Sequence, residues 1–169
     1  FTPPETIDKM IKMLSTYMKE IKTVLEPSCG SGEFITRLQK MKQLTITGIE
    51  YNKTIFDSIK SLENKYTHLY HENYLTYDSN CLYDLIIGNP PYFVVKKTEV
   101  DKQFLPYFEG RPNIFILFII KSLQLLKENG ILSFILPKSF LNCLYYDKPR
   151  KFIHDHYSIL SIVKCEDKY

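Results

Sequence analysis

The sequence predicts a single α/β domain built on a mostly parallel, twisted sheet with helices on both faces. Short β-branched or apolar runs alternate with segments whose apolar residues recur at helical spacing. This alternation requires right-handed crossovers, which place successive strands parallel in one sheet. The length of 169 residues is that of one domain, and 44% hydrophobic with 24% charged residues is ordinary for a globular protein.

The N-terminal half alternates helix and strand. Pro3 and Pro4 can open a helix because proline is tolerated in the first turn, and apolar residues at helical spacing continue it to about Lys19. Cys29–Gly32 breaks the chain between the first strand and the next helix. The predicted strands are Thr23–Glu26, Thr45–Glu50 and Thr67–Tyr70, and the helices after the first two carry Phe34, Ile35 and Leu38, and Ile55, Ile59 and Leu62.

The C-terminal half repeats the pattern around one long irregular stretch. An apolar strand is predicted over Tyr83–Gly88 and is ended by Asn89-Pro90-Pro91. The stretch Tyr92–Pro112 has no clear periodicity, and loops this long are usually functional or mobile. The remaining predicted elements are a helix capped by Asn113 and ended by Asn129-Gly130, a strand Ile131–Leu136, a helix Lys138–Tyr157 interrupted near Pro149, and a strand Ile159–Lys164.

Composition argues against several classes of protein. The four cysteines form no C-x-x-C pair, so neither a zinc site nor a redox motif is predicted, and we expect reduced thiols in a cytoplasmic chain. The histidine spacings indicate no metal site. No apolar run approaches the ~20 residues of a membrane span, so no membrane partner is expected. The net charge of +3 neither requires nor excludes nucleic acid.

Three polar motifs each follow a predicted strand. Glu26–Gly32 follows the first strand, Glu50 ends the second, and Asn89–Tyr92 follows the fourth. The carboxyl ends of parallel strands share one edge of the sheet, and ligands bind there at the switch point. We therefore expect the three motifs to converge on one site.

The first two motifs together favour a nucleoside ligand without a pyrophosphate. Gly30 and Gly32 permit positive φ and close approach of a ligand. The dinucleotide fingerprint needs a third glycine where Ile35 stands, and the phosphate loop needs a lysine that this loop lacks. Glu50 is placed to accept both hydroxyls of a ribose. Alone, the glycines would indicate a tight turn and Glu50 a solvated acid; their shared edge, together with Glu26, favours the nucleoside.

The tetrapeptide Asn89–Tyr92 is typical of a site that activates an amine. An aromatic amine is a poor nucleophile because its lone pair is delocalised. The Asn89 side-chain oxygen and the Pro90 carbonyl can accept its hydrogens, and consecutive prolines hold both oxygens in place. Tyr92 offers a face on which a base can stack. A bare Asn-Pro-Pro would indicate only a capped turn, but its place directly after a buried strand favours the catalytic interpretation.

In order and spacing, these motifs resemble the gamma-type, TaqI-like DNA adenine-N6 methyltransferases. The matching segments are Phe1–Pro4, Glu26–Phe34, Gly48–Asn52, Asn73–Leu75 and Asn89–Tyr92. The resemblance implies a Rossmann-like S-adenosylmethionine-dependent methyltransferase fold, with residues 1–169 forming the catalytic domain. It implies S-adenosyl-L-methionine as cofactor and, as partner, a DNA duplex with a flipped-out adenine, in a restriction-modification system.

The resemblance also implies a role for each matched residue. Asn89 and Pro90 would receive the target amine, and Tyr92 would stack on the flipped base. Glu50 would hold the cofactor ribose. The other implied cofactor-binding residues are Thr2, Pro3, Glu26, Ser28 and Gly30 at the methionine end, and Tyr51, Asn73, Tyr74 and Phe118 around the adenine.

The chain departs from the family pattern in two respects. Asn73 stands where the family usually has an acid, so we expect weaker cofactor binding at most. A seventh, antiparallel strand and a target-recognition domain are missing, so we expect the chain to be a piece of a longer protein. The family's second aromatic contact to the base would fall near Tyr169 or beyond it. Basic residues interleaved with aromatics in Phe93–Pro112 suit phosphates and an unstacked base, although any one lysine there fits a solvated surface better.

Other functions share parts of this pattern. Glutamine methyltransferases that act on release factors also use Asn-Pro-Pro-Tyr, but usually carry a helical domain ahead of the glycine loop, where this chain has one helix. The motifs do not distinguish adenine in RNA from adenine in DNA. A non-catalytic cofactor-binding subunit is an alternative of another class, which the intact Asn89, Pro90 and Tyr92 argue against. A small-molecule methyltransferase would not need the tetrapeptide.

Overall fold

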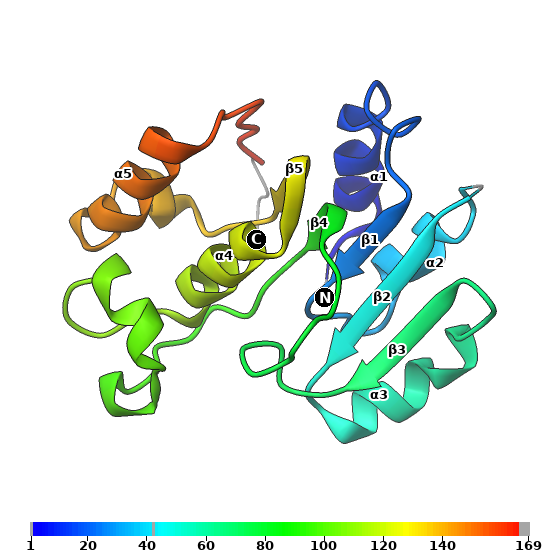
Figure 1. The fold of residues 1–169 in the computed structure, drawn as a ribbon, viewed down its shortest axis with the longest axis horizontal. Coiled ribbons are helices and arrows are strands. Elements are labelled where there is room, and N and C mark those ends of the chain that lie inside the picture. The colour runs from blue at the N-terminus through cyan, green and yellow to red at the C-terminus, as the bar shows by residue number, and fades with distance from the viewer. Residues whose placement is uncertain (1, 42, 166–169) are drawn as a thin grey trace.

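A computed structural model describes residues 2–41 and 43–165 and is centred on a five-stranded parallel sheet of order β3-β2-β1-β4-β5 (Figure 1). Each neighbouring pair of these strands is parallel. The α/β prediction is therefore confirmed. The strands are β1 (Thr23–Glu26), β2 (Thr45–Glu50), β3 (Thr67–His71), β4 (Tyr83–Gly88) and β5 (Leu126–Phe134).

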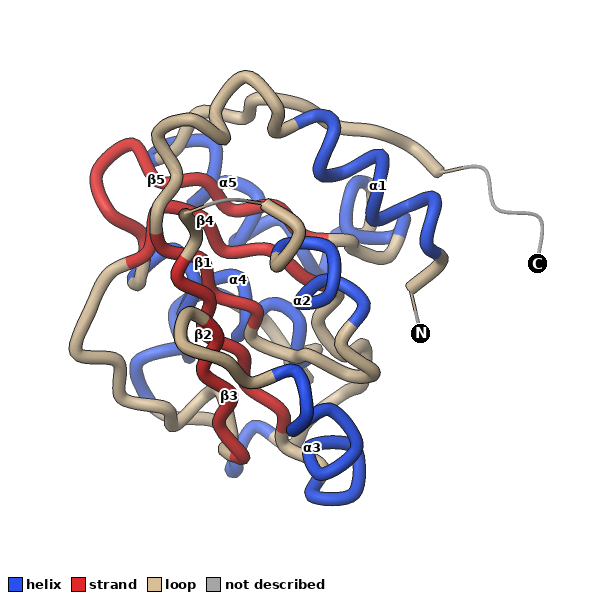
Figure 2. Tube along the Cα trace, turned by 90° about the vertical axis from the view of Figure 1, so that its right-hand side faces the viewer, coloured by secondary structure: helices blue, strands red, loops and turns tan. Residues whose placement is uncertain are grey.

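Helices cover both faces of the sheet. Figure 2 shows α1, α2 and α3 on one side, where they pack on inward residues such as Val24 and Leu85. Adjacent residues of a strand point to opposite faces, so Leu25 and Ile86 pack instead with Phe118 of α4. None of the described helices is long and apolar enough to cross a bilayer. The helices are α1 (Pro4–Met13), α2 (Glu33–Leu38), α3 (Lys53–Ile59), α4 (Ile114–Gln124) and α5 (Asp147–His156).

The boundary between α4 and β5 differs from the prediction. The helix ends at Gln124, and the strand begins at Leu126 rather than at residue 131. Leu126 already pairs with Tyr83, and the register of this pairing shifts before Leu85 meets residue 131. Residue 129 has a φ of 61° within this irregular part. Residues 126–128, which the predicted helix included, therefore belong to strand β5.

The segment after β5 also differs from the prediction. Residues 138–157 form two short 3-10 turns and then α5, rather than one long helix. Pro149 lies in the first turn of α5, where a missing amide hydrogen costs nothing, so the proline marks a helix start. The predicted strand Ile159–Lys164 is wrong. A strand needs a ladder partner, and this segment pairs with no described strand, so its apolar residues lie exposed.

One glycine lets the site loop lie against the sheet. A Cβ on Gly48 of β2 would stand 2.6 Å from the Cys29 sulfur and 2.6 Å from a Leu69 methyl carbon. No larger residue fits without displacing the loop after β1. The absence of a side chain at position 48 therefore sets how closely that loop approaches β2.

Candidate active site

The loop between β1 and α2 is a tight turn anchored on β2. Gly30 and Gly32 have φ values of 50° and 80°, which side chains disfavour. The Cys29 amide donates to the carbonyl of Ile49 at 2.9 Å, and the Gly32 amide donates to the carbonyl of Cys29 at 2.8 Å. A Cβ on Gly30 would have no heavy atom within 4 Å, so the loop faces open space at that point.

Glu50 fixes this loop with its carboxylate. Its Oε2 accepts the Gly30 amide hydrogen at 2.9 Å, and its Oε1 accepts that of Asn52 at 2.7 Å. The side chain is largely buried, with 9% exposed. A carboxylate has about four acceptor positions, so two remain for further donors such as the hydroxyls of a ribose.

Glu26 is a buried carboxylate with one oxygen that has no hydrogen-bond partner among the described residues. Its exposed fraction is 1%, and its Oε2 accepts no hydrogen bond from the described residues. Burial, reinforced by the nearby Glu33 and Glu50, raises the pKa of Glu26 well above its ordinary value. A buried acceptor without a donor is costly and marks a place where a ligand donor or cation belongs. The cationic methionine end of S-adenosylmethionine fits this requirement.

The glycine loop and the tetrapeptide are in contact. The Ser28 hydroxyl donates to the backbone carbonyl of Asn89 at 3.1 Å. A Cβ on Gly88 would lie 3.6 Å from Cγ of Glu26, so the unpartnered acid stands beside the end of β4. The structure therefore brings the first and third motifs together at one edge of the sheet.

The side-chain amide of Asn89 is held on both sides. Its Nδ2 donates to the Thr2 hydroxyl at 3.2 Å, and its Oδ1 accepts from the Tyr92 hydroxyl. The Tyr92 oxygen also lies 2.6 Å from the carbonyl of Ile135. Burial raises the pKa of Tyr92 to about 12, so the hydroxyl keeps its proton at neutral pH. The hydroxyl has one hydrogen for these two acceptors, and an amide oxygen has two lone pairs, so Oδ1 of Asn89 keeps an acceptor position for an incoming amine.

The Tyr92 ring is supported from behind. It meets Phe115 edge-on, with ring centroids 5.9 Å apart and planes at 87°. Phe115 in turn packs against Phe140 and Tyr146, at centroid distances of 5.7 Å and 5.2 Å. Tyr92 remains 42% exposed, so part of its ring is available for stacking, while Pro90 is buried.

The residues expected around the cofactor adenine divide into two groups. Tyr51 is 75% exposed, and Asn73 is also exposed, with its Oδ1 accepting the Leu75 amide hydrogen at 3.0 Å. Tyr74 and Phe118 lie in the core instead, 2% and 5% exposed, with ring centroids 4.8 Å apart. Their side chains therefore pack beneath the turn that carries Asn73, and their contact with a cofactor stays a prediction. Phe1 and Tyr169, also named above, lie outside the described residues.

Sequence reasoning assigned no role to Lys121. Its Nζ donates to the carbonyls of Leu75 and Tyr77 at 3.1 Å and 2.6 Å, and lies 5.5 Å from the Tyr74 ring centroid. Burial lowers the pKa of Lys121. The available signal was that Lys121 is the one charged residue in the apolar run 114–126. It anchors the turn that carries Asn73.

The long stretch after the tetrapeptide is closed by a short antiparallel stem. Val94 bridges Asn113, the Val95 amide donates to Pro112 O at 2.9 Å, and the Ile114 amide donates to Phe93 O at 2.9 Å. Between the two arms, Phe104 and Phe108 are buried. The stretch is therefore a packed loop rather than an unstructured one.

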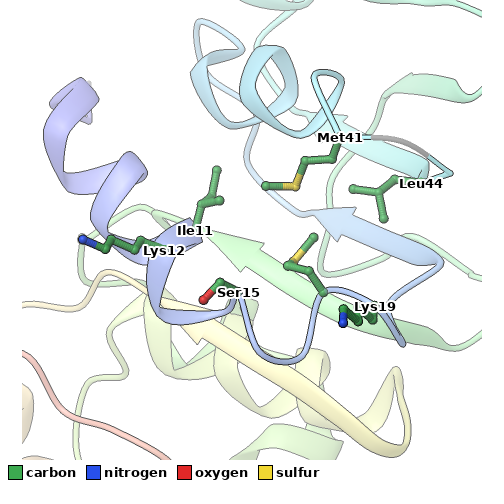
Figure 3. A pocket seen from close by; sticks show the side chains of 7 residues that line it. Ile11, Lys12, Ser15, Lys19, Met41 and Leu44 are labelled. Carbon is green, nitrogen blue, oxygen red and sulfur yellow. The ribbon is translucent and has the colours of Figure 1, made fainter.

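A separate groove of about 410 Å³ lies away from these motifs (Figure 3). Leu44, at its edge, immediately precedes β2, so the groove opens near the amino ends of the strands, opposite the site. It is lined by Ile11, Lys12, Ser15, Met18, Lys19, Met41 and Leu44. None of the residues expected in the active site lines it.

Comparisons with known proteins identify a family and a fold. A profile of the Eco57I restriction-modification methylases matches residues 6–169. The chain is 33% identical to Type II methyltransferase M.AccI of Acinetobacter calcoaceticus over 139 residues, covering 75% of this chain and 25% of that protein. It is 31% identical to Type II methyltransferase M.CvrRI of Paramecium bursaria Chlorella virus XZ-6E over 163 residues, covering 95% and 41%.

The fold matches a solved structure. A class I S-adenosylmethionine-dependent methyltransferase from Listeria monocytogenes superposes with a TM-score of 0.78 at 21% identity, covering 92% of this chain and 52% of that one. This likeness confirms the predicted Rossmann-like methyltransferase fold. The chain spans between a quarter and about two fifths of the two curated relatives described above.

Proposed function

Because the chain belongs to the Eco57I family of restriction-modification methylases, we propose that it is the catalytic domain of a DNA methyltransferase that acts on N6 of adenine. The domain comprises residues 1–169 of a longer cytoplasmic protein. Its methyl donor is S-adenosyl-L-methionine, its partner is a duplex from which the target adenine is flipped out, and its activity is part of a restriction-modification system.

One observation carries the proposal most directly. The amide of Asn89 is fixed between Thr2 and Tyr92 directly after Gly88, and Gly88 adjoins Glu26, whose Oε2 has no partner among the described residues. A neutral acceptor therefore stands next to an acid that suits a cation. This is the pairing needed to transfer a methyl group from a sulfonium to an aromatic amine.

The residues present fit the methyl donor. When bound, S-adenosylmethionine supplies a methyl carbon that bonds to the amine nitrogen as its carbon–sulfur bond breaks, with the electron pair remaining on sulfur. Glu26 faces the positive methionine end, together with Thr2, Pro3, Ser28 and Gly30. The free acceptor positions of Glu50 bind the ribose hydroxyls. Tyr51 and Asn73, both exposed, contact the adenine.

Asn89 and Pro90 prepare the nucleophile. Their two oxygens would accept the two hydrogens of the adenine amine, so that its lone pair localises on nitrogen and becomes available for methyl transfer. Both acceptors are neutral, and the consecutive residues Pro90 and Pro91, called the diproline corner, hold them in place before the reaction begins. No strong base is required, because the methylated ammonium passes its proton to water readily.

The target base has to leave the duplex to reach these oxygens. Tyr92 then exchanges one contact for another: its hydroxyl releases Oδ1 of Asn89, and its ring stacks on the base. Stacking of this kind contributes ~1–3 kcal/mol per base, enough to offset the lost hydrogen bond of about 1 kcal/mol. The basic and aromatic residues of loop 93–112 contact the surrounding phosphates and bases.

The test is methyl transfer by the full-length protein. Labelled S-adenosylmethionine is supplied with DNA, RNA or release-factor protein, and the nucleosides or peptides are digested and analysed by mass spectrometry. N6-methyladenine in DNA alone is expected. Label found only in RNA or in glutamine would refute the DNA-adenine assignment.

A matched pair of variants tests the role of the corner. Asn89→Ala should abolish transfer while leaving S-adenosylmethionine affinity, measured by calorimetry, within about twofold. Asn80→Ala, a change at an exposed asparagine in the loop before β4, should retain full activity. Equal activity in the two variants would show that Asn89 does not act on the amine.

A further inference from the structure

The chain between β5 and α5 forms an exposed hook, defined here as Lys138–Tyr146. It consists of two 3-10 turns, Lys138–Leu141 and Leu144–Tyr146. Leu144 and Tyr145 at its tip are 81% and 65% exposed. Adjacent exposed apolar side chains of this size are typical of a surface that binds something.

The hook is held rigidly although its tip is exposed. The Arg150 guanidinium donates to the carbonyls of Phe140 and Cys143, at 2.8 Å and 2.9 Å, and also to the Asp147 carboxylate. Phe140 is buried, and its ring packs against Phe115. The exposure of the tip therefore belongs to a pinned turn and not to a frayed one.

The hook lies close to the tetrapeptide Asn89–Tyr92. The Tyr92 hydroxyl bonds to Ile135, three residues before the hook begins. Tyr145 also reaches the loop after the tetrapeptide, since a Cβ on Gly110 would lie 3.3 Å from its ring. Figure 1 shows this gold and orange segment on the same side of the molecule as the green loop. The hook and the loop of residues 93–112 thus form one surface beside Tyr92.

This surface concentrates positive charge. Residues 92–112 and 138–146 hold five of the 22 Lys and Arg residues and three of the 19 Asp and Glu residues. Their net charge is therefore +2 over 30 residues, while the other 139 residues carry +1. A basic rim around exposed apolar side chains complements the phosphates and stacked bases of a duplex.

We infer that the hook is a second contact with DNA, in which Leu144 and Tyr145 enter the duplex at the position vacated by the flipped adenine. The inference rests on the proposed function. Extrusion of a base leaves its neighbours unstacked and its partner unpaired, and apolar side chains inserted between bases compensate for lost stacking. Leu144 and Tyr145 are apolar, exposed, pinned by Arg150 and close to the residue that receives the base.

The inference is tested on the full-length protein with both side chains truncated, Leu144→Ala with Tyr145→Ala. The matched control truncates Tyr66 and Leu82. These two exposed residues immediately precede β3 and β4, so they lie at the amino ends of the strands, whereas the hook follows the carboxyl end of β5. Each protein is assayed on a matched duplex and on the same duplex with an abasic site opposite the target adenine. In the abasic duplex the adenine is already unpaired, so a wedge contributes little.

The hook variant should lose roughly tenfold or more in kcat/KM on the matched duplex. On the abasic duplex it should stay within about twofold of the unmodified protein, as the control should on both. Equal losses on the two duplexes, or no loss, would overturn the inference. If the equal losses came with a lower Tm, the tip would pack against another part of the full-length protein, and the inference would also be overturned.

Failure of the proposed function gives a different result. If the unmodified full-length protein left no N6-methyladenine in either duplex, the adenine assignment would fall, and the role of the hook with it. That outcome is seen without any variant, so it is separate from a failure of the hook alone.

Discussion

The side-chain nitrogen of Asn89 donates to the hydroxyl of Thr2 across 3.2 Å, joining two residues 87 positions apart. The bond turns the amide nitrogen toward the N-terminal segment and leaves the oxygen toward Tyr92. The short segment before α1 therefore helps to orient the Asn89 amide. Under the proposed function, this bond leaves the amide oxygen for the amine of the substrate.

Thr2→Val removes the acceptor while preserving the shape of the side chain. Without it the amide can rotate, and we expect the single-turnover rate of methyl transfer to fall about tenfold, the equivalent of one hydrogen bond. The rate is measured at saturating S-adenosylmethionine, so that altered binding does not contribute. Thr2→Ser keeps the accepting hydroxyl, so its single-turnover rate should match that of the unmodified protein. An unchanged rate in the valine variant would show that the bond to Thr2 does not orient Asn89.

Two substitutions at Tyr92 separate its hydroxyl from its ring. Tyr92→Phe removes the donor that occupies Oδ1 of Asn89 but keeps the stacking face, so kcat/KM should stay within about twofold. Tyr92→Ala also removes the face and should cost ~1–3 kcal/mol, roughly 10- to 100-fold in kcat/KM. Steady-state assays of both variants check this. A large loss in the phenylalanine variant would assign the hydroxyl a positive role in the reaction.

Glu26→Gln should stabilise the protein and weaken cofactor binding. The folded chain holds the Glu26 proton more tightly than the unfolded chain, so stability falls as pH rises above the ordinary value of 4.5. Glutamine carries no charge and removes this penalty, for a gain of roughly 1 kcal/mol in urea unfolding at pH 7. Affinity for S-adenosylmethionine should drop at least ~10-fold by calorimetry. Glu20→Gln, a change at an exposed acid before β1, is the control.

The turn that carries Asn73 should depend on Lys121. Lys121→Met leaves the carbonyls of Leu75 and Tyr77 without their donor, which should cost about 1–3 kcal/mol in the free energy of unfolding. Urea denaturation followed by circular dichroism measures the loss. Lys60→Met, at an exposed position after α3, should change stability by less than about 0.5 kcal/mol. Equal effects would mean that the two carbonyls find other donors.

Asp84 joins β4 to the start of β1 and makes stability depend on pH. Burial alone would raise its pKa, but hydrogen bonds from Lys127, Thr23 and Lys22 outweigh it and lower the pKa to about 2. The resulting stability, about 2 kcal/mol, is present above about pH 4 and is lost as pH falls toward 2. Asp84→Asn should therefore be less stable at pH 7 and nearly equal to the unmodified protein near pH 2. Urea unfolding across this range checks it, with the exposed Asp57→Asn as control.

Much of the fold follows from local sequence pattern. The apolar runs at 23–26, 45–50 and 83–88 are strands within the predicted bounds, because each is short, buried and ended by a turn residue. The convergence of the glycine loop, Glu50 and Asn89 followed from topology alone, since parallel strands share a carboxyl edge. These features depend on neighbours in sequence or on the order of elements.

The features that sequence did not predict depend on distant partners. Leu126 joins β5 because Tyr83 offers it a ladder partner, which helical periodicity does not reveal. Residues 159–164 have the composition of a strand but pair with no described strand. Tyr74 and Phe118, expected near the cofactor adenine, are core residues, a burial that local pattern did not predict. The hydrogen bond from Tyr92 to Asn89 likewise depends on a side-chain rotation that spacing cannot specify.

The antiparallel stem of residues 93–95 and 112–114 brings the two ends of loop 96–111 side by side. Phe104 and Phe108 anchor the loop in the core, so changes of length at its exposed positions, away from these two residues, alter the entropy of loop closure only slowly. A relative could therefore acquire a new insertion here, with different contacts to its target, while keeping the same methyl-transfer chemistry. Under the proposed function, exchanging the exposed part of this loop between relatives tests whether it contributes to substrate preference.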